Sequence, residues 1–327
     1  MKKLPTLIKK LSISFILNSL VLKIHSIIPQ LRFYFFLKNR PAFDSTRNNQ
    51  IAFIIFSKDR CLQLDSLLSS LYCYIKGTFE VHVLYATEND RYGKAYEQLI
   101  EERKNTKLLY FYKQRESFKE SLKQILSNTV STRVFFLVDD LLFKNHFDLT
   151  KIDHINPDKE IFSLRHGNHL NYCYAMNKTQ PLPIFTQKEF FLQWKWNRST
   201  LDWAYPLSVD GHLFNKNDAF FWAENLSYKA PNSFETALQC FKKYYENLSG
   251  ICCCESIIFN NPCNKVQTEV SNVHGQNNSL SQLALLKLWE QGYRIDFNAL
   301  EGFRNISVHQ EVSFPLINKK KASANYD

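Results

Sequence analysis

Glycine is scarce in this sequence, with eight residues in a chain of 327. Neither G-x-G-x-x-G nor G-x-x-x-x-G-K-[ST] occurs in it. Both patterns need glycine to bring the backbone close to phosphate groups, so a dinucleotide-binding fingerprint and a P-loop are excluded. The eight cysteines include no C-x-x-C pair, which disfavours a zinc ribbon. Because a chain of this length can build a full core without disulfides, we expect free thiols.

Acidic residues are absent from residues 1–43, which hold eight of the 41 Lys and Arg. Residues 44–327 carry 33 basic and 31 acidic residues, so the net charge of +10 arises mainly in this basic amphipathic arm. A basic nucleic-acid-binding face on the folded body is therefore not indicated, and we expect no nucleic-acid partner.

Long apolar runs are also lacking. The uninterrupted stretch at residues 11–22 is too short to span a bilayer. Lysines and arginines on both sides favour an interfacial segment on an anionic leaflet, so we expect a cytoplasmic protein peripheral to the inner face of the membrane. A packed N-terminal helix and a signal or anchor helix are the alternatives.

Apolar runs and helical stripes alternate over residues 51–138. Runs rich in Ile, Val and Phe predict buried strands, and apolar residues at helical spacing predict helices. The expected strands are residues 51–56, 79–85, 107–112 and 133–138, and the expected helices are residues 62–74, 92–103 and 118–126. This order predicts an α/β fold, a doubly wound, mostly parallel sheet with helices on both faces.

Polar residues follow the strands at the edge where doubly wound sheets bind ligands. The first strand is followed by Ser57, Lys58, Asp59 and Arg60. This cationic segment suits an anionic nucleotide, although a solvated turn would contain the same residues. Glu88 follows the second strand and suits a base or a ribose hydroxyl, but its segment also suits capping of the next helix.

Two adjacent carboxylates, Asp139 and Asp140, follow the apolar run FFLV of the fourth strand. They repel each other, and each is costly to bury without a cation. Mg²⁺ and Mn²⁺ prefer carboxylate oxygens and neutralise diphosphate leaving groups. We therefore expect a divalent cation here, with a helix cap or surface turn as the alternative.

The segments IAFIIFSKDR, FFLVDDLLF, YPLSVDGHLF and PNSFE resemble GT-A glycosyltransferases, in particular the family-2-like bacterial enzymes. The resemblance covers residues 51–310. It implies hexosyl or related transfer from a nucleotide-sugar donor to a glycan or lipid-linked acceptor, in cell-surface polysaccharide biosynthesis, with Mn²⁺ or Mg²⁺ as cofactor. The D-x-D motif of the family falls on residues 138–140, where Val138 replaces the first acid.

The same resemblance divides the chain. It implies a glycosyltransferase domain at residues 50–312, with a nucleotide-binding half at 50–150 and an acceptor half at 151–312. Residues 313–327 are expected to form a flexible tail.

Residues of the second half complete the candidate site. A transferase that inverts its sugar needs a carboxylate to deprotonate the acceptor, and Glu235 is the first candidate, with Asp210 second. A capping-box role for Glu235 and a tight turn at Asp210 are the alternatives. Arg165 is a candidate for binding donor phosphate, and His274 for a further metal ligand. The tryptophans 194, 196 and 203 suit either a sugar-stacking platform or a core.

Two other functions remain open at this stage. A non-catalytic carbohydrate- or nucleotide-binding module would explain Val138 in the acidic motif. A nucleotidyltransferase also ends a strand in acids, but it needs a glycine-rich phosphate loop that this chain lacks. The sequence leaves the sugar, the nucleotide and the stereochemistry undetermined.

Overall fold

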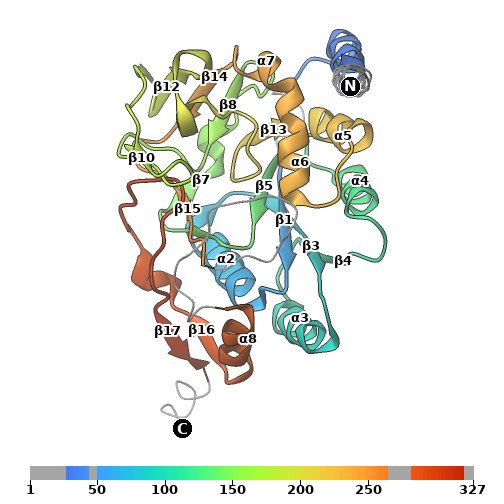
Figure 1. Cartoon of the computed structure of the whole chain (residues 1–327), viewed down its shortest axis with the longest axis vertical. Helices are drawn as coiled ribbons and strands as arrows, with labels where there is room; N and C mark the ends of the chain where they lie inside the picture. Colours follow the sequence, from blue (N-terminus) through green and yellow to red (C-terminus); the bar gives the residue numbers. More distant parts are fainter. Residues whose placement is uncertain (1–26, 44–49, 264–280, 320–327) are drawn as a thin grey trace, which may run out of the picture.

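The structure is a computed structural model that describes residues 27–43, 50–263 and 281–319 (Figure 1). Its centre is a five-stranded sheet in the order β13-β5-β1-β3-β4. The parallel strands are β1 (Ile51–Lys58), β3 (Phe79–Ala86), β4 (Leu109–Lys113) and β5 (Arg133–Val138), and β13 (Leu213–Asn215) is antiparallel to β5. The predicted α/β class with a mostly parallel sheet is confirmed.

Helices join and cover these strands. They are α2 (Cys61–Tyr74), α3 (Asp90–Arg103), α4 (Phe118–Asn128), α5 (Lys216–Asn225), α6 (Pro231–Leu238), α7 (Lys242–Tyr245) and α8 (Gln282–Glu290). The three strand–helix repeats lie where the sequence predicted them, with ends that differ by a few residues. The fourth predicted strand, residues 133–138, matches β5 at both ends.

The strands β1, β3 and β5 bury both faces, and their successive side chains point to opposite sides, whereas the edge strand β4 is partly exposed. On β1, Phe53 and Ile55 pack in a core with α2, α3 and α8, whereas Ile54 and Phe56 pack in a second core with α4, α5 and α6. Figure 1 shows the two groups of helices on opposite flanks of the sheet. The predicted covering of both faces is therefore confirmed.

The second half adds a mixed sheet in the order β11-β12-β14-β8. Its strands are β11 (Thr186–Lys188), β12 (Phe191–Lys195), β14 (Ser249–Cys252) and β8 (Glu160–Ser163). The short strands elsewhere are β2 (Ile75–Lys76), β6 (Leu141–Phe143), β7 (Phe147–Asp148), β9 (Tyr172–Cys173), β10 (Lys178–Thr179) and β15 (Ile258–Asn260).

The three candidate stacking tryptophans belong to the core of this half. Trp194, Trp196 and Trp203 are each at most 2% exposed and pack around His166. No face of these rings is available to a sugar, so the platform hypothesis is wrong and core packing is the correct alternative. All eight cysteines are free, as predicted.

The predicted flexible tail begins too early. β17 (Leu316–Asn318) pairs antiparallel with β16 (Tyr293–Ile295), so residues 316–318 belong to the folded body. Residues 316–318 are Leu, Ile and Asn, and the polar run that suggested a tail starts only at Lys319. Residues 320–327 lie outside the described residues.

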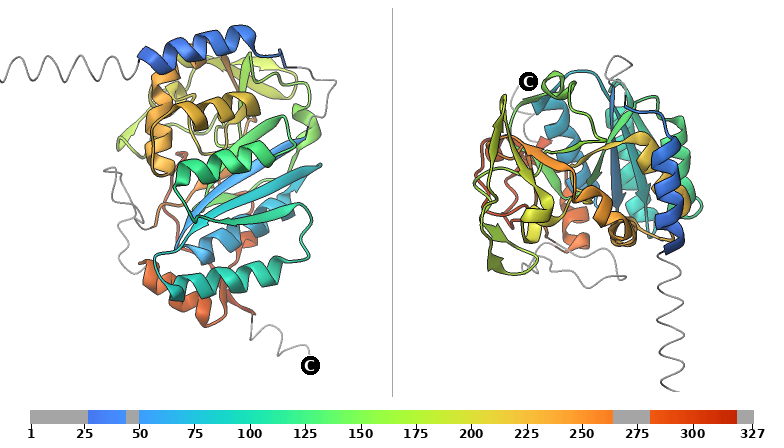
Figure 2. Two further views of the ribbon diagram at one scale, coloured as in Figure 1. Left: turned by 90° about the vertical axis from the view of Figure 1, so that its right-hand side faces the viewer. Right: turned by 90° about the horizontal axis from the view of Figure 1, so that it is seen from above.

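Residues 27–39 are helical, so the described part of the N-terminal arm contains a packed helix. Figure 2 shows this helix at the periphery of the molecule, over α5 and α7. In the part of the chain that the structure describes, no helix combines the length and the apolarity that crossing a bilayer requires. The apolar stretch at residues 11–22 lies outside that part.

Candidate active site

The carboxyl end of β1 and the carboxyl end of β5 are joined through Asp139. Its Oδ2 accepts hydrogen bonds from Ser57 Oγ at 2.9 Å and from the Lys58 backbone N–H at 3.1 Å. Its Oδ1 lies 2.9 Å from Nη1 of Arg60, the residue that precedes α2. Both oxygens of this buried carboxylate are therefore bound by the protein.

Asp140 shares the same guanidinium but is more accessible. Its Oδ2 lies 3.1 Å from Arg60 Nη1, and its Oδ1 accepts a hydrogen bond from the Asn260 side chain at 3.3 Å. The Asp140 side chain is 16% exposed, against 5% for Asp139. A ligand at the sheet edge can thus reach Asp140 more readily than its neighbour.

Arg60 explains how two adjacent acids are tolerated at a buried strand end. Burial raises the pKa of Asp139, while the positive charge of Arg60 lowers it and the charge of Asp140 raises it. Burial alone would lower the pKa of the Arg60 guanidinium. The two carboxylates outweigh burial and raise that pKa above its ordinary value. The cluster is held together by one cation between two anions.

A strained turn follows β1. Asp59 has a positive φ of 55°, a conformation that aspartate tolerates better than most side chains. Its Oδ1 accepts a hydrogen bond from the Glu88 backbone N–H at 2.8 Å, and its buried Oδ2 has no hydrogen-bond partner among the described residues. The Glu88 side chain is exposed, and capping of α3 is performed by Asn89. The predicted donor-side residues 57–60 and Glu88 are therefore brought together.

A second cluster surrounds Asp210, in the loop before β13. Arg165 Nη1 lies 2.6 Å from Ser208 Oγ and 3.2 Å from Asp210 Oδ2. His309 Nε2 lies 3.5 Å from the same Asp210 oxygen. Arg165, which the sequence placed with the donor residues, is thus a partner of Asp210.

Backbone pairing brings this second cluster to the end of β5. The Gly211 N–H donates to the Phe136 carbonyl at 2.8 Å, two residues before the end of the strand. On its other side, the Gly211 carbonyl accepts from the Leu164 N–H at 2.9 Å. Gly211 has a φ of 79°, as the predicted tight turn requires. Asp210 is therefore fixed beside the strand end that carries Asp139.

Asn260 connects the two clusters. Its side chain binds Asp140, and its backbone forms a parallel bridge with His309, through hydrogen bonds with Val308 and Gln310. Two regions that the sequence treated separately therefore form one continuous polar site. Asn260 was not predicted, because an asparagine in a short strand of the second half carries no distinctive sequence signal.

Glu235 reaches this site from α6. Its Oε1 accepts a hydrogen bond from the Val209 backbone N–H at 3.2 Å. The capping interaction expected of it is made by Ser233, whose hydroxyl accepts from the Ala230 N–H at 2.9 Å. The capping-box alternative for Glu235 is therefore wrong, and its carboxylate faces the loop of Asp210.

The two carboxylates of this cluster have opposite pKa shifts. Loss of solvation, followed by repulsion from Asp210, raises the pKa of Glu235 to about 7. Burial also disfavours the charged form of Asp210, but the His309 hydrogen bond and the charge of Arg165 outweigh it and lower the pKa. Pairs of acids whose pKa values are pushed apart are typical of acid–base catalysis.

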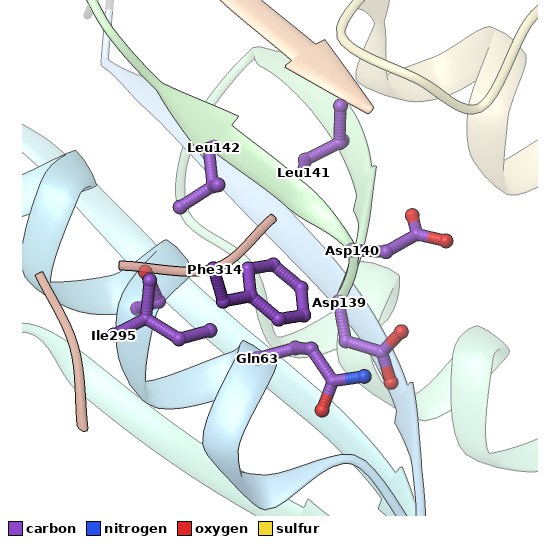
Figure 3. Close-up of a pocket in the computed structure, with 8 residues that line it drawn as sticks. Gln63, Asp139, Asp140, Leu141, Leu142, Ile295 and Phe314 are labelled. Atoms are coloured by element: carbon purple, nitrogen blue, oxygen red, sulfur yellow. The ribbon is translucent and has the colours of Figure 1, made fainter. Parts of the chain in front are cut away.

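A shallow hollow with almost no room for a water molecule lies against the acidic pair (Figure 3). It is lined by Gln63, Ser66, Asp139, Asp140, Leu141, Leu142, Ile295 and Phe314. Both carboxylates turn to the same side, away from Leu142 and Ile295. Because ligand pockets usually hold roughly 300–1,000 Å³, this hollow is too small for a nucleotide sugar.

The acidic pair fits a cation that is held jointly with a phosphate ligand. Among the described residues, no three His, Cys, Asp or Glu side chains gather as a complete metal site. Mg²⁺ needs only one or two protein carboxylates when substrate phosphates and water supply its other ligands. Both oxygens of each carboxylate already have a protein partner, but the Asp140 side chain is the more exposed of the two and is therefore better suited to this role. His274 lies outside the described residues.

The chain was compared with known proteins by sequence. No family model matches the chain. It is similar to the bifunctional glycosyltransferase pgtA of Dictyostelium discoideum, at 28% identity over 193 aligned positions that cover 53% of this chain and 25% of that protein. The match spans about a quarter of the relative's length. It supports the resemblance to glycosyltransferases drawn from the sequence.

Solved structures give weaker similarities. The structure of S. aureus TarS 1–349 in complex with UDP-GlcNAc has 15% identity and a TM-score of 0.45, covering 68% of this chain and 62% of that chain. The mannosyltransferase PcManGT from Pyrobaculum calidifontis, in complex with GDP-Man and Mn²⁺, has 16% identity and a TM-score of 0.30, covering 43% of this chain and 44% of that chain.

Proposed function

We propose that this chain is a glycosyltransferase that moves a sugar from a nucleoside-diphosphate sugar to a hydroxyl group of a glycan or lipid-linked acceptor. The observation that carries the proposal is the meeting of two acidic clusters at one sheet edge, through the Gly211–Phe136 backbone hydrogen bond. The sequence similarity to a glycosyltransferase supports the same class of reaction.

The donor end of the site is the turn after β1 together with Asp140. The buried Oδ2 of Asp59, which has no partner within the described part of the chain, offers an acceptor for a donor N–H or O–H group of the nucleotide. A divalent cation bound by Asp140 and the diphosphate would neutralise the charge of the leaving group. Asp139 would position the turn, because its oxygens bind Ser57, the Lys58 N–H and Arg60.

The acceptor end is the cluster of Glu235 and Asp210. With a pKa of about 7, Glu235 is present in both its ionised and its protonated form near neutral pH, and the ionised form can accept a proton. In a single displacement, the acceptor oxygen bonds to the anomeric carbon as its proton passes to Glu235. The bond from that carbon to the diphosphate oxygen breaks, and the nucleoside diphosphate leaves with the electron pair. Asp210, paired with Arg165 and His309, would hold the loop that orients Glu235.

Thermal-shift measurements with UDP and GDP, each with and without Mn²⁺, test the donor assignment. We expect one nucleotide to stabilise the protein in a cation-dependent way, and Asp140→Ala to abolish that dependence. Glu224→Ala, at an exposed acid of α5, is the matched control and should behave as the unmodified protein. Absence of any nucleotide-dependent shift would contradict the proposal.

Hydrolysis of the corresponding nucleotide sugar separates an enzyme from a binding module. We expect slow release of the nucleoside diphosphate in the presence of the protein and cation. Glu235→Gln should reduce that release without reducing the thermal shift by the nucleotide. Binding with no turnover of any UDP- or GDP-sugar would favour the non-catalytic alternative.

A further inference from the structure

The helix of residues 27–39 has one face docked on the protein body. Phe33 is fully buried, with ring-centroid distances of 5.2 Å to Phe221 on α5 and 4.5 Å to Phe241. The Gln30 side chain donates to the Cys240 carbonyl at 2.9 Å. After the helix, Arg40 Nη1 lies 2.6 Å from Asp158 and 3.2 Å from Asp218. These contacts fix the orientation of the helix on the molecule.

The opposite face carries large apolar side chains with no cover among the described residues. This outward face consists of Ile27, Ile28, Leu31, Tyr34 and Phe35, whose exposed fractions lie between 41% and 60%. Their spacing of three, four and seven residues places them on one side of a helix. Five exposed apolar residues in a continuous stripe are unusual on a soluble surface and mark a site of interaction.

The charge of the arm indicates which partner covers this face. Arg32 and Lys38 are exposed on the same helix, and residues 1–43 contain eight basic residues and no acidic one. The like charges of a second copy of the chain would repel this arm. A bilayer with anionic headgroups over an apolar acyl region would accept both the apolar side chains and the positive charges of this helix.

We propose that the outward face of the helix at residues 27–39 docks the protein on a bilayer that contains anionic lipids. The apolar side chains enter the boundary between headgroups and acyl chains, and the flanking basic residues contact lipid phosphates. Because Phe33 and Arg40 fix the helix to the body, docking also fixes the orientation of the body relative to the bilayer. This inference is independent of the proposed enzymatic activity.

Cosedimentation of the full chain with lipid vesicles tests the proposal. We expect binding to vesicles of phosphatidylcholine and phosphatidylglycerol, weaker binding to phosphatidylcholine alone, and release by added salt. The double variant Leu31→Glu, Phe35→Glu should bind anionic vesicles about tenfold more weakly or worse. The matched control is Ile184→Glu, Phe190→Glu, which changes two side chains that are 92% and 76% exposed elsewhere and should bind unchanged.

A gain-of-signal variant keeps the test informative if the glutamates disturb folding. The five natural tryptophans are buried, so Leu31→Trp adds an exposed one. We expect brominated lipids in anionic vesicles to quench its fluorescence. Lack of quenching, equal binding by the glutamate variant, or equal loss in the control would overturn the proposal. So would a dimer in sedimentation equilibrium that the glutamate variant converts to a monomer, because a second copy would then cover this face.

Discussion

Asp210 raises the pKa of Glu235 by repulsion, although the protein keeps Asp210 itself ionised through Arg165 and His309. Two residues with the same functional group thus have opposite protonation behaviour within one cluster. Burial of Glu235, with the repulsion from Asp210 added to it, makes this residue a base that works near neutral pH, rather than a carboxylate that is always ionised.

The first prediction concerns the pH dependence of transfer. Because Glu235 must be ionised to accept a proton and has a pKa of about 7, we expect kcat/KM to rise with pH through about 7. Glu235→Gln should lower kcat by roughly 10²–10⁴-fold. Asp210→Asn should shift the rising limb to lower pH, because it removes the repelling charge. A limb that does not move in Asp210→Asn would show that another group is titrating.

The second prediction concerns stability and has the opposite sign to activity. The folded-state pKa of Glu235 is raised above its ordinary 4.5, so its ionisation reduces the stability of the folded protein as the pH rises from 4.5 through about 7. We therefore expect Glu235→Gln to be more stable than the unmodified protein at pH 8, by on the order of 1–2 kcal/mol after allowance for partial exposure. Urea denaturation should show this difference shrinking toward pH 4.5. A variant less stable at pH 8 would contradict the assignment.

The third prediction separates the two adjacent acids. Asp139→Asn weakens the main partner of a buried guanidinium, so we expect a loss of about 2–4 kcal/mol in the free energy of unfolding. Asp140→Asn should cost less than about 1 kcal/mol, because its side chain is partly exposed and Asn260 remains nearby. In nucleotide-binding measurements the larger effect should come from the other variant: Asp140→Asn should reduce the dependence on Mn²⁺ more than Asp139→Asn does. Equal stability of the two variants would contradict the distinct roles assigned to these residues.

The fourth prediction concerns packing around the tryptophan core. A Cβ added at Gly250 on β14 would lie 2.3 Å from the ring of Trp194, so Gly250→Ala should destabilise the protein by about 1–3 kcal/mol or more. Gly93 in α3 is the matched control, since a Cβ added there would meet only Thr87 Oγ1, at 4.0 Å. Gly93→Ala should stabilise the protein by about 0.5–1 kcal/mol through helix propensity. The two variants should therefore move the thermal midpoint in opposite directions.

The first half of the fold could be predicted from the sequence because its signals are local. β5 is an apolar run that ends at two acids, and α2 has a regular apolar stripe, so neither depends on distant residues for recognition. The short strand β13 and the bridge between Asn260 and His309 were not predicted, because three-residue pairings are specified only by their partners across the fold.

The sequence predicted which residues belong to the candidate site better than it predicted which of them contact one another. Glu235 and Asp210 were named from the need for a base, and the structure places them in one cluster. Arg165 was assigned to donor phosphate from its charge, but the structure pairs it with Ser208 and Asp210. Charge indicates the kind of partner, whereas only the packing of the second half determines which carboxylate is within reach.

The salt bridges of Arg60 also bear on whether the protein needs a metal ion in order to fold. Zinc fingers and similar small domains stay unfolded until a metal arrives to neutralise their ligands. Here Arg60 supplies that neutralisation from the chain itself, so we expect the fold to form without the divalent cation proposed above. A chelator should then abolish the proposed transferase activity without lowering the thermal midpoint of unfolding. Adding the ion back should restore the activity without a refolding step.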